Sequence, residues 1–285
     1  MESERIAVKD EPRYESEYSP RQTEAARRVL VDLGQILAAF ADCLVVVGGW
    51  VPDLLIKDAE ERHVGSIDVD LALDAARLTE GRYAKLIETL LNTSRYQQAE
   101  ESFKLLTQVD LNDGEPPVHV DVDFLKASEV KLKKNRPKLT DGFRPLDADG
   151  CACAFDHPEL VILAGPMPKG AKNKVQFRVA SVADFLVMKS YALKKRDKPK
   201  DAYDICYCLD YYPGGAVKIA EVWNTQPRKR YVSEAIEILR EKFGGLDAYG
   251  PSQVIDFHNS TDTEERSRQQ RRAFELVQNF LTLLP

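Results

Sequence analysis

Two short apolar segments of this chain each carry a pair of aspartates separated by a single residue. The first is Ile67-Asp-Val-Asp-Leu-Ala-Leu73 and the second is Val118-His-Val-Asp-Val-Asp-Phe-Leu125. A β-strand points alternate side chains to the same face, so each pair of carboxylates shares one face and its apolar neighbours share the other. Carboxylates this close repel each other and are costly to bury without a cation. The two segments therefore predict strands whose acidic face binds a positive partner.

The chemistry of these carboxylates favours a hard divalent cation. Mg²⁺ takes oxygen ligands, typically one or two carboxylates plus substrate phosphates. Asp68 and Asp70 are the predicted ligands, and a third carboxylate, Asp123 or Asp121, would help activate an attacking hydroxyl. The alternative for the first pair is an edge strand with a solvated acidic face. The second acidic strand favours a metal-dependent phosphoryl- or nucleotidyl-transfer site.

A Gly-Gly turn precedes the first acidic segment. Gly48 and Gly49 follow the short apolar strand Cys43–Val47 and precede the start of a brief helix. Glycine lets backbone N–H groups approach an anion closely, and a helix N-terminus adds partial positive charge. Ser66 either caps the loop or contacts a phosphate. The turn therefore predicts a phosphate subsite beside the acids.

A third group of charged residues lies between 189 and 204. Lys189 and Arg196 are seven residues apart and are predicted to share a helix face. Asp201 and Asp204 are three apart and face together on the next helix, which also carries Lys200. The pattern is open to two interpretations: ion pairing between helices, or a phosphate clamp whose cations the aspartates hold in place.

Length and charge limit the class of protein. No apolar run approaches the roughly 20 residues of a membrane span, and the polar N-terminus has no signal-peptide pattern. We therefore expect a cytoplasmic protein with no membrane partner. The net charge of −6 argues against a general nucleic-acid binder, although basic residues cluster between Lys126 and Lys138.

Periodicity predicts an α+β protein with a mainly helical C-terminal part. Strands are expected at 43–47, 67–73, 103–109, 118–125, 160–164 and 175–179. Helices are expected at 20–41, 51–55, 78–91, 181–196, from 199 past 209 but ending before Pro213, and at 216–224, 231–243 and 264–284. Residues 1–20 are predicted to form a polar N-terminal arm.

These motifs resemble those of a known family. Gly48-Gly49, Ser66-Ile-Asp68-Val-Asp70 and Lys189…Arg196…Lys200-Asp201…Asp204 are similar to the motifs of the AbiEii/AbiGii toxin family of polymerase-beta-like nucleotidyltransferases. The resemblance covers roughly residues 43–210. It implies a polymerase-beta-like nucleotidyltransferase domain at 21–180, a mixed sheet flanked by helices. A helical domain at 181–285 would complete the active site.

The residue patterns and the resemblance together predict roles for single residues. The predicted catalytic residues are Asp68, Asp70, Asp121, Asp123, Lys189 and Asp204. The predicted nucleotide-binding residues are Gly48, Gly49, Ser66, Lys189, Arg196, Lys200 and Asp201. The predicted Mg²⁺ ligands are Asp68, Asp70 and Asp123.

The chain departs from the family pattern in four places. Eighteen residues separate Gly49 from Asp68, a longer connection than is usual, and the bulky Trp50 follows the glycines. The junction after Arg196 is one or two residues longer than its tightest form. Val-Asp123-Phe-Leu matches the pattern slightly better than Val-Asp121-Val-Asp, so the identity of the third acid stays open.

The expected activity is transfer of a nucleoside monophosphate from an NTP to an acceptor hydroxyl. The resemblance implies a tRNA 3′ end as acceptor and a toxin–antitoxin setting with a cognate antitoxin; the cluster at 126–138 would then contact the RNA backbone. One alternative is a nucleotidyltransferase that modifies a small molecule of the aminoglycoside type. Another is a non-catalytic nucleotide- or RNA-binding module of the same fold.

Overall fold

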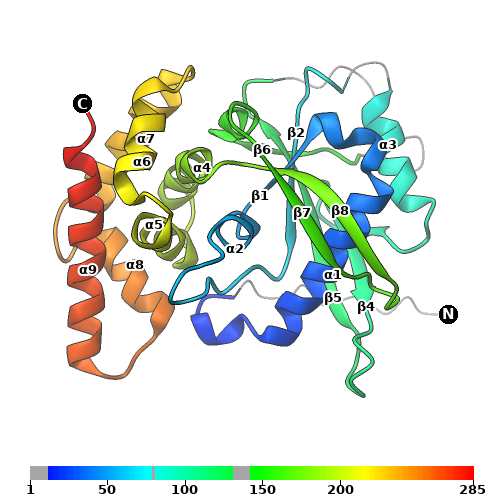
Figure 1. Cartoon of the computed structure of the whole chain (residues 1–285), viewed down its shortest axis with the longest axis horizontal. Helices are drawn as coiled ribbons and strands as arrows, with labels where there is room; N and C mark the ends of the chain where they lie inside the picture. Colours follow the sequence, from blue (N-terminus) through cyan, green and yellow to red (C-terminus); the bar gives the residue numbers. More distant parts are fainter. Residues whose placement is uncertain (1–11, 79–80, 131–141) are drawn as a thin grey trace.

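The computed structural model describes residues 12–78, 81–130 and 142–285 (Figure 1). Strands of one mixed sheet lie between residues 44 and 179, and helices make up most of the chain from residue 182 to residue 282. The predicted α+β class, a mixed sheet flanked by helices and followed by a mainly helical part, is confirmed.

The described strands pair in the order β3-β4-β5-β2-β1-β8-β7, and β6 pairs with β5. Their bounds are β1 Leu44–Val47, β2 Val69–Leu73, β3 Gln97–Gln98, β4 Lys104–Val109, β5 Val118–Ala127, β6 Leu146–Ala148, β7 Glu159–Pro166 and β8 Lys172–Val179. Strand β2 is antiparallel to β1 and parallel to β5. The two acidic segments of the sequence are therefore neighbours in the centre of the sheet.

Helix α1 (Pro20–Ile36) packs across the sheet and contacts β4, β5, β7 and β8. Its start follows the predicted signals, because the Ser19 hydroxyl accepts from the backbone N–H of Gln22 and Pro20 occupies the first helical position. The predicted helix extends too far, since a 3₁₀ helix (Ala38–Cys43) replaces its last turn. Such tighter turns are frequent at helix ends.

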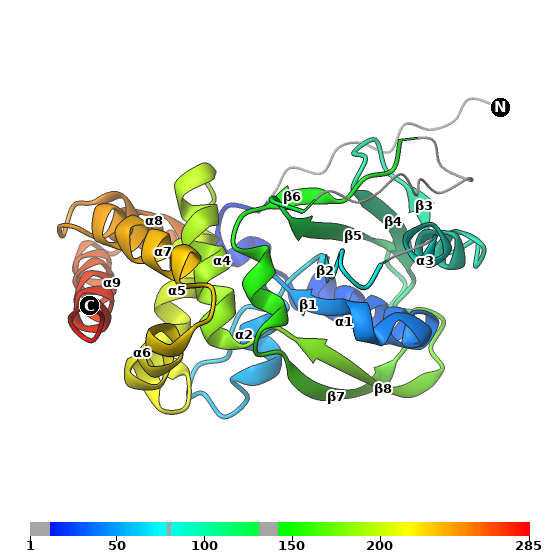
Figure 2. The ribbon, with the colours of Figure 1, turned by 90° about the horizontal axis from the view of Figure 1, so that it is seen from above.

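The remaining helices divide between the sheet and the far end of the molecule. Their bounds are α2 Trp50–Leu55, α3 Arg82–Leu91, α4 Val182–Lys195, α5 Lys200–Tyr211, α6 Gly215–Thr225, α7 Lys229–Lys242, α8 Tyr249–His258 and α9 Thr263–Thr282. Helices α4 and α5 lie between the sheet and the outer helices in both views (Figures 1 and 2). Helix α2 contacts both of them. The end of the sheet that carries the Gly-Gly turn therefore faces α4 and α5.

The core extends across both predicted domains. One cluster of buried apolar side chains runs from Tyr18 to Leu284 and includes β1, β2 and β5 as well as α4, α5 and α9. The division at residue 180 stays a prediction. Among the helices that the structure describes, none combines the length and the apolarity of a membrane span.

Part of the N-terminal arm contacts the helical half. The Arg13 guanidinium lies 3.0 Å from a carboxylate oxygen of Asp197, and His258 lies 2.8 Å from Glu15. Residues 1–11 lie outside the described residues, as do positions 131–138 of the basic cluster, which leaves Lys126 as its described member.

Candidate active site

Four aspartates from β2, β5 and the residues just before β2 line one cavity of about 260 Å³. Asp70 is directly opposite Val47 on β1 and directly opposite Asp123 on β5. Neighbouring strands lie about 4.8 Å apart, so these two carboxylates start from adjacent backbone positions. Asp121 precedes Asp123 by two residues on β5 and shares its face, and Asp68, in the bend just before β2, lines the same cavity.

Most of the residues predicted from sequence line this cavity, and two do not. Its lining includes Gly48, Gly49, Ser66, Asp68, Asp70, Asp121, Asp123, Lys189, Arg196 and Lys200. Asp201 and Asp204, both 0% exposed, are absent from the lining and lie behind the cations. The functional roles predicted for all these residues stay predictions, but the geometry brings ten of the twelve to one cavity.

The Gly-Gly turn packs directly against an acid on one side and a cation on the other. Gly48 has φ +69, and a Cβ there would stand 1.9 Å from Asp70 Oδ2. At Gly49 a Cβ would stand 2.9 Å from both Lys200 Nζ and Ser66 Oγ. Gly48 therefore requires glycine, because its backbone conformation and the Asp70 carboxylate both exclude a side chain, whereas a side chain at Gly49 would displace the ends of Lys200 and Ser66.

The acids perturb one another in the way that closely spaced carboxylates do. Burial and the charge of Asp68 raise the pKa of Asp70 to about 6, and burial and the charge of Asp70 raise the pKa of Asp123 to about 8. Burial also acts to raise the pKa of Asp68, but Lys198 and a 2.5 Å hydrogen bond from the Ser66 hydroxyl lower it. The acidic face therefore favours binding of a cation.

Lys104 on β4 is a member of this site that the sequence reasoning missed. Its ammonium lies 2.8 Å from Asp121 and 4.0 Å from Asp123. Burial acts to lower the pKa of Lys104, but the charges of Asp123 and Asp121 outweigh it and raise the pKa. The turn-rich segment 110–117 signals a β-hairpin, and pairing its strands would have placed Lys104 opposite Asp123.

The donors present on the acidic face fit Mg²⁺. All are carboxylate oxygens, and Asp123 Oδ1 is buried with no hydrogen-bond partner in the described structure. Within the described ranges, no group of three or more His, Cys, Asp or Glu side chains is arranged to hold a metal ion by itself. A Mg²⁺ ion held by one or two carboxylates together with substrate phosphates does not need such a closed group.

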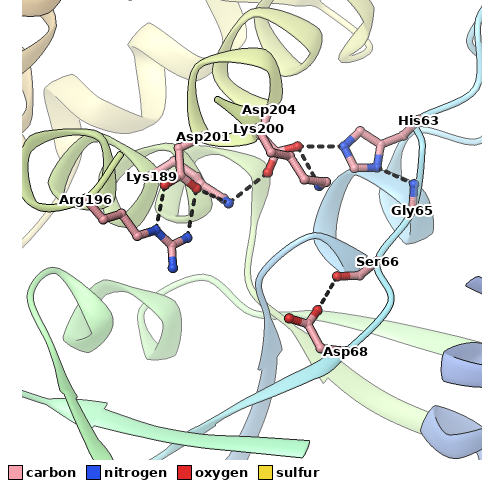
Figure 3. Close-up of polar contacts among 9 residues, drawn as sticks. All are labelled: His63, Gly65, Ser66, Asp68, Lys189, Arg196, Lys200, Asp201 and Asp204. Carbon is pink, nitrogen blue, oxygen red and sulfur yellow. Dashed lines mark hydrogen bonds and ion pairs between the residues drawn. The ribbon is translucent and has the colours of Figure 1, made fainter. Parts of the chain in front are cut away.

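The opposite wall of the cavity carries cations held by buried carboxylates (Figure 3). Lys189 Nζ lies 2.6 Å from Asp201 and 2.8 Å from Asp204, and Lys200 Nζ lies 2.9 Å from Asp204. The Arg196 guanidinium donates two hydrogen bonds to Asp201, at 2.7 and 2.9 Å. The ion pairs predicted as one interpretation of this motif are therefore present, on cations that also line the cavity.

These ion pairs hold both aspartates in the charged form. Burial acts to raise the pKa of Asp201, yet Lys189 and Arg196 lower it to about 2. Burial also opposes ionisation of Asp204, but Lys189 and Lys200 hold its pKa well below the usual value. The prediction that Lys189 and Arg196 share a helix face is wrong, because α4 ends at Lys195 and Arg196 has an extended backbone. Both side chains nevertheless reach Asp201.

Two residues of the long connection before β2 complete the site. The Trp50 indole N–H donates to the backbone carbonyl of Asp68 at 2.7 Å, so the bulky residue after the glycines supports the acidic segment. His63 Nε2 lies 2.8 Å from Asp204 Oδ1. No sequence signal predicted His63, because its partner is 141 residues away.

This site combines paired aspartates on a mixed sheet, a Gly-Gly turn beside them, and lysines opposite them that are held by buried aspartates. Such an arrangement is expected of a nucleotidyltransferase. Comparison with protein families supports this class: residues 31–279 match the family described as "Nucleotidyl transferase AbiEii toxin, Type IV TA system". The chain belongs to this nucleotidyltransferase family, which confirms the resemblance seen in its motifs.

Comparison with curated proteins gave no match. Among solved structures, the chain is similar to a crystal structure of an antigenic nucleotidyltransferase-like protein from Paracoccidioides brasiliensis. The two are 15% identical, the match covers 79% of this chain and 91% of that chain, and the TM-score is 0.43.

Proposed function

We propose that this protein is a Mg²⁺-dependent nucleotidyltransferase that transfers a nucleoside monophosphate from an NTP to an acceptor hydroxyl. The observation that carries the proposal is the register of Asp70 with Asp123 beside Gly48. It brings two carboxylates from separate strands to a glycine turn, in a cavity whose other wall carries Lys189 and Lys200.

Asp68 and Asp70 would hold the metal together with the substrate phosphates, with Asp123 as the third carboxylate beside them; the metal would supply charge neutralisation at the phosphates and a lower pKa of the attacking hydroxyl. Asp123 is preferred to Asp121 as the third carboxylate for two reasons. It is directly opposite Asp70. In addition, Asp121 accepts a 2.8 Å hydrogen bond from Lys104, whereas Asp123 Oδ1 has no hydrogen-bond partner in the described structure.

The residues of this chain then have separate tasks in the reaction. The cations of α4 and α5 and the Gly48–Gly49 backbone hold the triphosphate so that the α-phosphorus faces the acceptor. The acceptor O–H gives its proton to the Asp123 carboxylate, and its oxygen bonds to the α-phosphorus. The bond from that phosphorus to the bridging oxygen breaks, and pyrophosphate leaves. Asp201 and Asp204 hold Lys189 and Lys200 in position, and the charge of Asp204 favours the protonated form of both ammonium groups, in Lys200 against the lowering of its pKa by burial.

We propose a tRNA 3′ end as the acceptor, an action in the cytoplasm as a toxin, and a cognate antitoxin as partner. The family description, which names a toxin of a type IV system, supports this setting. The basic positions 131–138 that would contact the RNA backbone lie outside the described residues. The test of the acceptor is therefore the labelling experiment below.

The test incubates the protein with Mg²⁺, each labelled NTP and total RNA. Label on tRNA is expected, while label on a small molecule would support the aminoglycoside-type alternative instead. Asp70→Asn is expected to abolish transfer, and Asp58→Asn, an exposed aspartate outside the cavity, should leave it unchanged. Absence of transfer to any acceptor by the wild-type protein would contradict the proposal and favour a non-catalytic binding module.

A further inference from the structure

The connection between α2 and β2 places one histidine deep inside the molecule. His63 is 6% exposed and its side chain is fully buried. Its ring stacks on Tyr203 with centroids 5.4 Å apart, and meets Tyr207 edge-on at 4.9 Å. Both tyrosines belong to α5, so the ring plane of His63 is fixed by the helix that also carries Lys200 and Asp204.

The hydrogen bonds of His63 define its tautomer. Nδ1 accepts the backbone N–H of Gly65 at 3.0 Å, so it carries no proton. Nε2 must then carry the proton and donate it to Asp204 Oδ1 at 2.8 Å. Burial and the charge of Lys200 lower the pKa of His63 to about 4, which keeps the ring neutral at physiological pH.

Each of these two hydrogen bonds leads to one wall of the cavity (Figure 3). On the Nε2 side, Asp204 Oδ1 accepts the hydrogen bond from His63 and also one from Lys200 Nζ, at 2.9 Å. On the Nδ1 side, Gly65 leads directly to Ser66, whose hydroxyl donates to Asp68. His63 therefore links the cationic wall with the acidic wall.

Lys200 and Ser66, the residues at the ends of these two hydrogen-bonded connections, both lie beside the Gly-Gly turn. Lys200 Nζ and Ser66 Oγ lie within 2.9 Å of the point where a Cβ on Gly49 would be. An ammonium group fixed at this point lies beside the backbone turn that is proposed to receive phosphate. Rotation of the Asp204 carboxylate would displace that ammonium, and the hydrogen bond from His63 opposes the rotation.

We propose that His63 is a positioning residue for nucleotide binding: through Asp204 it fixes the Lys200 ammonium beside the Gly48–Gly49 turn, where the triphosphate binds. The role rests on the proposed nucleotidyltransferase function.

Two substitutions separate the two hydrogen bonds of the ring. In His63→Asn, the side-chain oxygen takes the place of Nδ1 and can keep the bond from Gly65, but nothing reaches Asp204. In His63→Gln, the amide nitrogen takes the place of Nε2 and can still donate to Asp204. The loop contact is therefore kept in the first variant and the contact to the cationic wall in the second.

The measurements are titration of a non-hydrolysable NTP analogue in the presence of Mg²⁺, kcat and KM, and thermal unfolding. We expect His63→Asn to weaken NTP binding about tenfold and to raise KM in parallel, since loss of a hydrogen bond to a charged group has an effect of this order. His63→Gln should bind within about threefold of the wild type on the same reasoning. Equal weakening in both variants, or unchanged binding in His63→Asn, would overturn the role of His63.

A measurement on the wild-type protein keeps the inference testable if His63→Asn does not fold. The chain has four histidines, and ¹⁵N NMR identifies His63 as the signal that is lost in His63→Gln. At pH 7 that signal should be the neutral Nε2–H tautomer; if the lost signal is instead Nδ1–H or an imidazolium, the proposal is refuted. If the wild-type protein binds no NTP, the proposed function itself fails; if it binds NTP and the variants match it, only the role of His63 fails.

Discussion

The substitution Gly48→Ala tests whether the glycine turn exists to admit the Asp70 carboxylate. A methyl group at Gly48 would stand 1.9 Å from Asp70 Oδ2, and contacts under 3.0 Å essentially never occur for a Cβ atom. The carboxylate would therefore have to move by about 1 Å, the difference between these two distances. Gly48 also has φ +69, so alanine adds backbone strain.

The backbone strain at Gly48 predicts a small loss of stability, whereas the displacement of the Asp70 carboxylate predicts a large loss of reaction rate. The left-handed conformation costs alanine about 1–2 kcal/mol, and reduced freedom of the unfolded chain offsets about 0.4–1 kcal/mol of that. A net loss of about 1 kcal/mol lowers the Tm of a protein of this size by only about 2–4 °C. A displacement of about 1 Å at a reacting group, in contrast, can cost on the order of 100-fold in rate.

Gly114→Ala is the matched control, because Gly114 has φ +85 and nothing within 4 Å of its Cβ position. We expect similar small losses of Tm for the two variants in differential scanning fluorimetry. In the nucleotide-incorporation assay, Gly48→Ala should be about 100-fold slower, while Gly114→Ala should keep the wild-type rate. If Gly48→Ala retains a rate within about threefold of the control, the reasoning from the Asp70 contact is wrong.

Two further predictions concern the charges around the cavity. Lys104→Met removes a cation that lowers the pKa of Asp123, so this pKa should rise further. The acidic limb of the pH dependence of kcat/KM should then move to higher pH. If that limb does not move, Lys104 does not act on Asp123. Asp204→Asn removes the counterion of buried Lys189 and Lys200 and should lower the free energy of unfolding by about 3–5 kcal/mol in urea titrations, with part of the loss recovered when Lys200→Met is added. A loss below about 1 kcal/mol would be at odds with a buried ion-pair network.

Local patterns were enough to predict the two acidic strands and the face that their carboxylates share. Alternation in Val118–Leu125 places Asp121 and Asp123 together whatever the rest of the chain does. The neighbours of a strand depend on contacts that are distant in sequence, so the parallel pairing of β2 with β5 and the register of Asp70 with Asp123 were not predictable. That register is also what distinguishes Asp123 from Asp121.

Helix α8 shows a different reason for failure, because the sequence pattern predicted no helix there. Its first turn contains a Gly-Pro pair, Gly250 and Pro251, which is typical of a turn or loop. Proline is tolerated in the first turn of a helix because a backbone N–H at that position would have no hydrogen-bond partner within the helix. A Cβ at Gly250 would stand 2.5 Å from the Phe243 ring, so glycine allows the start of α8 to approach the end of α7 closely. The glycine is therefore explained by packing that only the structure shows.

The distribution of counterions gives a physical reason for the kind of ligand that we propose for this cavity. Behind the cationic wall, two buried aspartates neutralise Lys189, Lys200 and Arg196 in part. Six aspartates line the cavity; four of them, Asp68, Asp70, Asp121 and Asp123, form the acidic wall, and Lys104 contacts two of these four. The raised pKa values of Asp70 and Asp123 express this imbalance. A ligand that carries a divalent cation on one side and phosphate charge on the other would relieve the repulsion on the acidic wall and pair with the cations opposite. A metal–triphosphate has this distribution of charge, whereas a purely anionic or purely cationic ligand meets one wall of its own sign.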